Sequence, residues 1–197
     1  LLMEKRNDQL LRYLWLFGWR EVPRIDARLL ELATSRNEAI QSAAISALAN
    51  VRSDAVRELG LRLLRLDKRS AERGAFELFV RNYRPGDHVV FEAALPISDN
   101  PDVLHWAGRD LAKIADKQDA PELSECMLWV YENTPCSNCR RDPLKTLLRW
   151  KRAPKAMLAE CVWDCSEEIR KLAKAALRGN APRKWIREKG PKRPSSG

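Results

Sequence analysis

The chain has 197 residues, of which 45% are hydrophobic, and this composition excludes an intrinsically disordered protein. Its net charge of +9, from 36 Lys and Arg against 27 Asp and Glu, permits nucleic acids, acidic proteins or anionic lipids as partners without selecting one. No apolar run approaches the roughly 20 residues of a bilayer-spanning helix. The longest candidate, residues 10–19, is interrupted by Arg12 and lacks the features of a signal peptide, so we expect no membrane partner.

The first amphipathic segment, residues 10–18, predicts a helix that has no partner helix before it. It is similar to the second helix of the pairs described below. The chain also starts with Leu1 and Leu2 and has no initiator Met ahead of them. We therefore expect the N-terminus to be a cut edge of a longer array.

Five pairs of apolar-periodic segments follow. The first helix of each pair is expected at residues 27–33, 55–66, 89–95, 122–131 and 155–163. The second helices share four core positions with the spacing i, i+4, i+7, i+8, which is the stripe of an amphipathic helix. The strongest stripes are Ile40, Ala44, Ala47, Leu48; then Val103, Ala107, Asp110, Leu111; and then Ile169, Ala173, Ala176, Leu177. The weaker ones are Ala71, Ala75, Leu78, Phe79 and Cys139, Pro143, Thr146, Leu147.

The last residues of successive stripes are 31, 32, 36 and 30 positions apart, which indicates a repeat. The longest interval contains residues 131–141 and marks the least generic part of the chain. Helix-start signals precede the second helices at Asn37, Asn100-Pro101, Thr134-Pro135 and Ser166. Pro143 should kink its helix or mark the true start. Because no sustained period-two alternation occurs, we predict an all-α fold.

Residues 166–173, Ser-Glu-Glu-Ile-Arg-Lys-Leu-Ala, followed by Ala176 and Leu177, resemble the second helix of HEAT-like repeats of the phycobilisome-lyase type. Residues 37–48 are similar, with Gln41 where Arg is common. The resemblance covers about residues 10–178 and implies a right-handed α-solenoid, or superhelix, of about five helical hairpins. It also implies that the second helices line a concave face.

We accordingly expect a HEAT-like repeat domain over residues 1–180 and a basic, flexible tail over residues 181–197. Outward positions four residues apart lie above one another on each second helix. Side by side, these columns predict a basic ridge on the concave face, strongest over the third and fourth repeats. The basic ridge consists of Arg73, Arg81, His105, Arg109, Lys113, Arg141, Lys145, Arg149 and Lys171.

A basic concave face suits a non-catalytic scaffold that binds another protein, either as a monomer or as part of a larger chain. The alternative is a protein that binds the phosphate backbone of nucleic acid, which requires Lys and Arg but no base code. A third explanation needs no partner, because amphipathic helices place Lys and Arg in solvent. HEAT-like DNA glycosylases combine a basic concave face with tryptophans, but no segment here matches their motif.

The chain has seven tryptophans. Tryptophan at helical spacing most commonly belongs to the core. Trp106 and Trp150 are adjacent to positions of the basic ridge, so they are the candidates for stacking on bases.

Five cysteines without a secretory signal favour reduced thiols and a cytoplasmic location. Cys136, Cys139, Cys161 and Cys165 follow the pattern C-x2-C-x21-C-x3-C, which is close to the spacing of structural zinc sites. The apolar positions of Cys126, Cys139 and Cys161 favour core packing instead. A redox or reactive thiol at a helix start is the third alternative. A thioredoxin-like motif is not indicated, because no β-α-β pattern surrounds it.

No catalytic pattern emerges. His88 and His105 are the only histidines, and neither has the spacing of a catalytic triad or a metal pair. No glycine-rich phosphate loop is present. We therefore expect no enzyme and no cofactor, with zinc as the one alternative.

Overall fold

The computed structural model describes residues 4, 6–18, 20, 25–67, 69–134 and 136–179. Within these residues 68% of the chain is helical and no strand occurs, so the predicted all-α class is confirmed. The predicted basic tail, residues 181–197, lies outside the described residues, as do Trp19 and Trp185.

The described residues form ten α-helices and two short 3-10 helices. In chain order they are α1 (Asn7–Phe17), α2 (Ala27–Leu32), α3 (Glu38–Leu48), α4 (Asp54–Leu66), η1 (Ala75–Phe79), α5 (His88–Ala93), α6 (Pro101–Gln118), η2 (Pro121–Leu123), α7 (Ser124–Asn133), α8 (Ser137–Trp150), α9 (Lys155–Cys161) and α10 (Glu167–Leu177).

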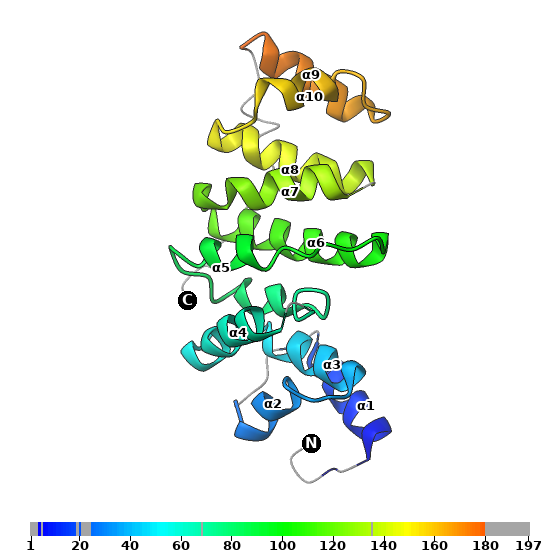
Figure 1. The fold of residues 1–197 in the computed structure, drawn as a ribbon, viewed down its shortest axis with the longest axis vertical. Coiled ribbons are helices and arrows are strands. Elements are labelled where there is room, and N and C mark those ends of the chain that lie inside the picture. The colour runs from blue at the N-terminus through cyan, green and yellow to red at the C-terminus, as the bar shows by residue number, and fades with distance from the viewer. Residues whose placement is uncertain are drawn as a thin grey trace, which may run out of the picture.

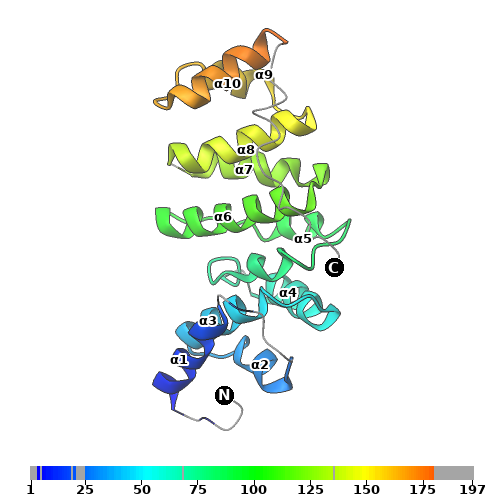
Figure 2. The same cartoon turned by 180° about the vertical axis from the view of Figure 1, so that it is seen from behind.

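The helices follow one another along the long axis of the molecule, from α1 near one end to α10 at the other (Figure 1, Figure 2). One line of contacts joins α1, α3, η1, α6, α8 and α10, and we call it the second-helix line. A shorter line joins α4, α5 and α7. Contacts between α2 and α3, α4 and η1, α7 and α8, and α9 and α10 connect partners within pairs. These contacts are consistent with a helical array.

The small residues at the second position of four predicted stripes are buried. Ala44, Ala75, Ala107 and Ala173 are at most 1% exposed, as their positions predicted. The stripe of α10 is less completely covered, since Leu177 is 48% exposed at the end of the last described helix.

Phe91 of α5 holds the middle of the core together. Its ring meets those of Phe76 and Phe79 of η1 at centroid distances of 5.3 and 4.7 Å, edge to face, and it also contacts Tyr83. Edge-to-face contacts add to the free energy gained by burying these large rings. The cluster thus connects the two lines of contacts.

Two of the predicted helix starts are closed by side-chain caps. The Asn37 side chain accepts hydrogen bonds from the N–H groups of Ala39 and Ile40, and Asn100 accepts one from Asp102. The start predicted at Thr134-Pro135 is wrong, because Thr134 is the C-cap of α7. Its hydroxyl donates a hydrogen bond of 2.6 Å to the Val130 carbonyl. Ser166 precedes α10 as predicted but makes no capping hydrogen bond.

The second stripe does not form the predicted α-helix. Residues 71–74 are turns, and only the 3-10 helix η1 follows. Gly74 lies between them with a φ of 88°, a conformation that glycine adopts readily and that interrupts a right-handed helix. The stripe residues Ala71, Ala75, Leu78 and Phe79 are nevertheless buried.

Pro143 lies inside α8, which begins six residues earlier at Ser137. Of the two alternatives predicted for Pro143, a kink in the helix or its start, the second is therefore wrong. Elsewhere, no helix of the described chain is both long enough and apolar enough to cross a membrane.

Gly60 provides a test of how closely α4 packs on η1. A Cβ atom at this position would lie 2.6 Å from Cε2 and 2.8 Å from Cζ of Phe79. At an exposed helical site, Gly to Ala would stabilise the protein by up to about 1 kcal/mol. We predict instead that Gly60→Ala lowers the free energy of unfolding by about 1–3 kcal/mol, measured by urea denaturation.

Arg62→Ala, at an exposed position of the same helix, is the matched control and should stay within about 0.5 kcal/mol of wild type. A Gly60→Ala variant as stable as wild type would contradict the close approach of α4 and η1.

Candidate functional site

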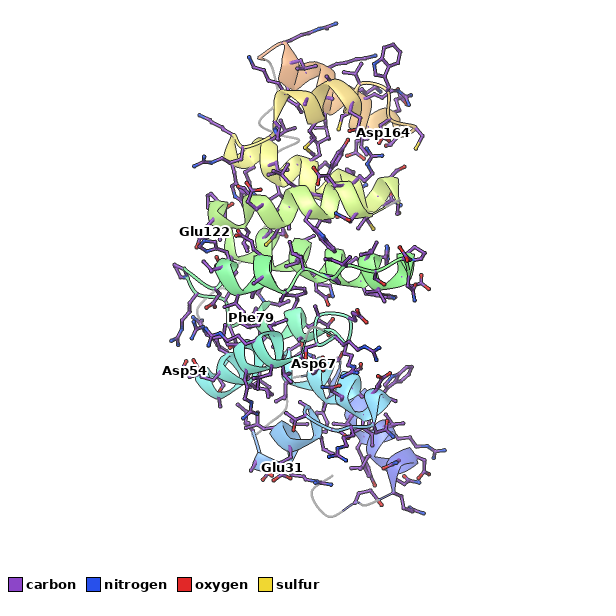
Figure 3. All side chains as sticks on the ribbon, viewed as in Figure 1. Glu31, Asp54, Asp67, Phe79, Glu122 and Asp164 are labelled. Carbon is purple, nitrogen blue, oxygen red and sulfur yellow. The ribbon has the colours of Figure 1, made fainter. Side chains whose placement is uncertain are left out.

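The basic ridge lies on the second-helix line. Arg73 and Arg81 flank η1, Lys171 is on α10, and the other six residues are on α6 and α8. The structure therefore brings the predicted residues onto neighbouring elements of one stack, in which side chains from successive elements meet (Figure 3).

Over η1 and α6, cations of the ridge are already paired with acids from other elements. Arg73 Nη2 lies 2.8 Å from Glu38 Oε1 of α3, and Arg73 Nη1 lies 3.0 Å from Asp67 Oδ2. Lys113 Nζ lies 3.2 Å from Glu77 Oε1 of η1. These side chains hold adjacent elements together and do not present free charge.

The same pairing continues over α8. Lys145 Nζ lies 2.6 Å from Glu168 Oε1 of α10, and Arg141 reaches the same carboxylate at 3.4 Å. Arg149 Nη1 lies 3.5 Å from Asp116 Oδ1 of α6. The hydrogen bond from Lys145 lowers the pKa of Glu168, which keeps this carboxylate charged at neutral pH.

We call these cross-element pairs the ionic ladder. Several of its partners lie about one repeat apart in sequence: 35 residues for Arg73 and Glu38, and 36 for Lys113 and Glu77. Each exposed pair contributes at most about 1 kcal/mol to stability, yet together they neutralise much of the ridge. The sequence analysis identified these cations but not the acids that pair with them. Acidic residues about one repeat away in sequence were the signal that could have identified the pairs.

One part of the ridge differs from the ladder. The exposed Arg109 forms no ion pair with a described residue, and its guanidinium carbon lies 4.9 Å from the centre of the Trp106 ring. Trp106 is 54% exposed, and the His105 ring meets it edge to face at 5.3 Å. We call His105, Trp106 and Arg109 the α6 platform.

The expectation that tryptophans belong to the core is wrong for Trp15 and Trp163, and Trp106, a candidate for surface stacking, is exposed as well. Trp106, Trp163 and Trp15 are 54%, 86% and 75% exposed. Trp129 and Trp150 pack partly against the core, and the Trp150 indole donates to Asp119 Oδ1 at 2.8 Å. Of the two candidates for surface stacking, Trp106 is therefore the more accessible.

A buried carboxyl lies beneath the ladder. Asp110 accepts a hydrogen bond of 2.9 Å from Lys113, while the Ser46 hydroxyl donates to the neighbouring Glu77. Burial, and then repulsion by Glu77, raise the pKa of Asp110 to about 7, although the charge of Lys113 acts in the opposite direction. Lys113 stays protonated, because the two carboxylates raise its pKa despite its partial burial.

The four cysteines of the zinc hypothesis do not gather at one point. The buried Cys161 thiol contacts Tyr131 Oη at 3.2 Å, and Cys165 Sγ lies 2.8 Å from Ser137 Oγ. Cys136 and Cys139 lie together at the amino end of α8. Among the residues that the structure describes, no group of three or more His, Cys, Asp or Glu side chains is arranged to hold a metal ion.

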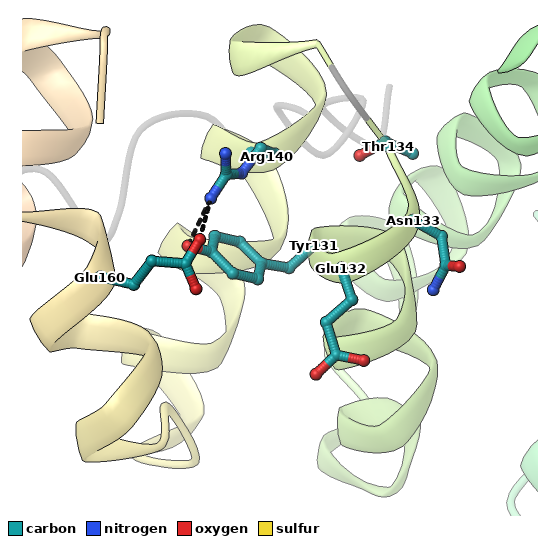
Figure 4. A pocket seen from close by; sticks show the side chains of 6 residues that line it. All are labelled: Tyr131, Glu132, Asn133, Thr134, Arg140 and Glu160. Carbon is teal, nitrogen blue, oxygen red and sulfur yellow. Dashed lines mark hydrogen bonds and ion pairs between the residues drawn. The ribbon is translucent and has the colours of Figure 1, made fainter. Parts of the chain in front are cut away.

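A polar pocket of about 350 Å³ opens beside the end of α7 (Figure 4). It is lined by Tyr131, Glu132, Asn133, Thr134, Arg140 and Glu160. Arg140 Nη2 donates to Tyr131 Oη at 2.6 Å and to Glu160 Oε1 at 2.8 Å, and its guanidinium stacks 4.5 Å from the tyrosine ring centre. Arg140 of α8 thus joins Tyr131 of α7 to Glu160 of α9, while its buried Nε has no hydrogen-bond partner among the described residues.

No protein-family model matches the chain, and no curated protein or solved structure matches it either. The family is therefore not identified, and the HEAT-like resemblance stays a prediction based on residues 37–48 and 166–177.

Asp110 predicts an unusual dependence of stability on pH. A carboxyl whose pKa is higher in the folded state binds more protons when folded, so it contributes stability at low pH that is lost as the pH rises through about 7. The wild-type free energy of unfolding should fall by an amount on the order of 4 kcal/mol between about pH 4 and pH 8, and we predict that Asp110→Asn removes this decrease. Denaturant titrations across this range measure it.

Asp102→Asn is the matched control, since Asp102 is an exposed carboxylate on the same helix and forms no ion pair with a described residue. Unlike Asp110→Asn, this control should show the same change of unfolding free energy with pH as wild type. Equal slopes for wild type and Asp110→Asn would show that Asp110 does not titrate in this range.

Proposed function

We propose that the chain is a non-catalytic scaffold that binds another protein through its second-helix line, with the α6 platform at the centre of the contact. The observation that carries this proposal is the accessible Trp106 ring, in contact with both His105 and Arg109. Tryptophan and arginine are the residue types that most often supply binding energy at protein interfaces.

The finer architecture belongs to the same proposal: a right-handed α-solenoid of HEAT-like hairpins in a cytoplasmic protein. The contacts from α3 through η1, α6 and α8 to α10 support it, because a single hairpin cannot bury its own apolar face and must stack on its neighbours. In such a solenoid the second-helix line would form the concave face.

Nucleic-acid binding is the second candidate and has weaker support. Binding to a phosphate backbone depends on Lys and Arg that exchange their counterions for phosphates. Arg73, Lys113 and Lys145 instead face carboxylates of the same chain. A face whose charge is compensated and that carries an accessible Trp-Arg pair is better suited to bind a protein partner. A HEAT-like DNA glycosylase has less support than either the protein-binding or the nucleic-acid-binding proposal.

Affinity capture with wild-type, Trp106→Ala and Trp163→Ala baits, from nuclease-treated cell extract of the native source, tests the proposal. We predict at least one protein that wild type and Trp163→Ala retain and that Trp106→Ala loses by at least about tenfold, because truncating a central interface tryptophan costs about 2 kcal/mol or more. Quantitative mass spectrometry measures the retention.

Both tryptophans are exposed, so both variants should unfold within about 0.5 kcal/mol of wild type, which separates lost binding from misfolding. The proposal fails if no retained protein depends on Trp106. Tight binding of random-sequence duplex DNA at about 150 mM salt, lost in Arg109→Glu, would favour the nucleic-acid alternative.

A further inference from the structure

Cys136 and Cys139 occupy the N-cap and the third position of α8. Side chains at these two positions face each other across the first turn, as in a capping box. Cβ atoms three residues apart on a helix are about 5–6 Å from each other, and a disulfide requires about 3.5–4.5 Å. Because Cys136 precedes the helix with an extended backbone, at φ −80° and ψ 123°, its thiol can approach Cys139 while α8 stays intact.

The two thiols have different surroundings. Cys136 is partly exposed. The N–H groups of Cys139 and then Asn138, at the start of α8, lower the pKa of Cys136. Since the thiolate is the form that reacts with electrophiles, Cys136 is suited to be the attacking sulfur.

Cys139 is suited to a second step, in which it would attack the Cys136 sulfur after that sulfur has reacted. Its Sγ lies 3.2 Å from Nδ1 of His105, which α6 supplies. Burial, followed by the neighbouring Cys136, raises the pKa of Cys139 to about 11; Arg109 acts to lower it, and Asp142 to raise it. Cys139 therefore stays protonated until a base removes its proton, and a neutral His105 with its hydrogen on Nε2 can accept it.

We propose that Cys136 and Cys139 form a peroxide-sensitive dithiol that closes to a reversible disulfide, with His105 as the base for the closing step. This inference does not require the proposed scaffold function, although His105 also belongs to the α6 platform. It rests on two thiols in one helical turn and on an imidazole from another helix that contacts one of them.

The oxidant is hydrogen peroxide. The Cys136 thiolate attacks one peroxide oxygen, an S–O bond forms and the O–O bond breaks, and the leaving hydroxide takes a proton to become water. Cys139 then transfers its proton to His105 and attacks the Cys136 sulfur. The S–S bond forms, the S–O bond breaks, and the second hydroxide leaves as water with the proton from His105. Two thiols and one peroxide thus give one disulfide and two waters.

Cys165 is the competing partner. It is exposed, and its sulfur contacts Ser137, the residue that follows Cys136. Cys126 and Cys161 are buried and are not accessible to peroxide in the same way.

The test adds one equivalent of hydrogen peroxide to the fully reduced chain and measures the intact mass. We expect a loss of about 2 Da, reversed by dithiothreitol, with the bond mapped to Cys136 and Cys139 in a proteolytic digest. In the reduced protein, iodoacetamide should modify Cys136 at least about tenfold faster than Cys139, a comparison that requires no variant.

Variants assign the steps. Cys139→Ser should stop at a sulfenic acid on Cys136 that dimedone traps, and Cys136→Ser should leave Cys139 reduced. His105→Ala should accumulate the sulfenic acid before closure. Cys165→Ser, the matched control, should form the disulfide as wild type does.

A disulfide that requires Cys165, or peroxide addition to Cys136 without any mass loss, would overturn the proposal. Equal alkylation rates at Cys136 and Cys139 would also contradict it.

Discussion

The array depends on the alignment of each helix pair with the next one, about one repeat further along the chain. Asn82 illustrates this constraint: its buried amide donates to the Val51 carbonyl at 2.9 Å and accepts from the Ser53 N–H at 2.8 Å, 31 and 29 residues away. Arg57 and Asp87, 30 residues apart, form a two-bond ion pair. A shift of register would leave such buried polar groups without partners, at a cost of about 1–3 kcal/mol each. Polar contacts therefore fix the register of a stack that apolar burial drives.

The same register determines the charge of the surface. It places Glu77 beside Lys113 and Glu168 beside Lys145, so cations that could bind a partner instead join neighbouring elements. The α6 platform lies outside this compensation because its arginine stacks on an accessible tryptophan. The proposed interaction surface is thus small and partly apolar rather than a continuous basic groove, which is why a protein is the favoured partner.

The helices could be predicted from the sequence because each stripe is a local pattern: the spacing of Ala44, Ala107 and Ala173 identifies buried faces without knowledge of any neighbour. The failures have both local and non-local causes. Gly74 shortens one helix to a 3-10 turn while its apolar stripe stays buried. The acid that each ridge cation meets, and the exposure of Trp106, depend on how far one helix is displaced along the next, and spacing alone does not determine that displacement.

The most direct test of the alignment is a double-mutant cycle on Arg57 and Asp87, an ion pair whose side chains are only 17% and 4% exposed. Arg57→Met, Asp87→Asn and the double variant would be compared with wild type by urea denaturation. The one-repeat register predicts a coupling free energy of at least about 1.5 kcal/mol. Removing either partner of a largely buried, two-bond ion pair abolishes most of the contribution of that pair to the free energy of unfolding. Additive effects, with coupling below about 0.3 kcal/mol, would contradict the register from which the ionic ladder and the α6 platform both follow.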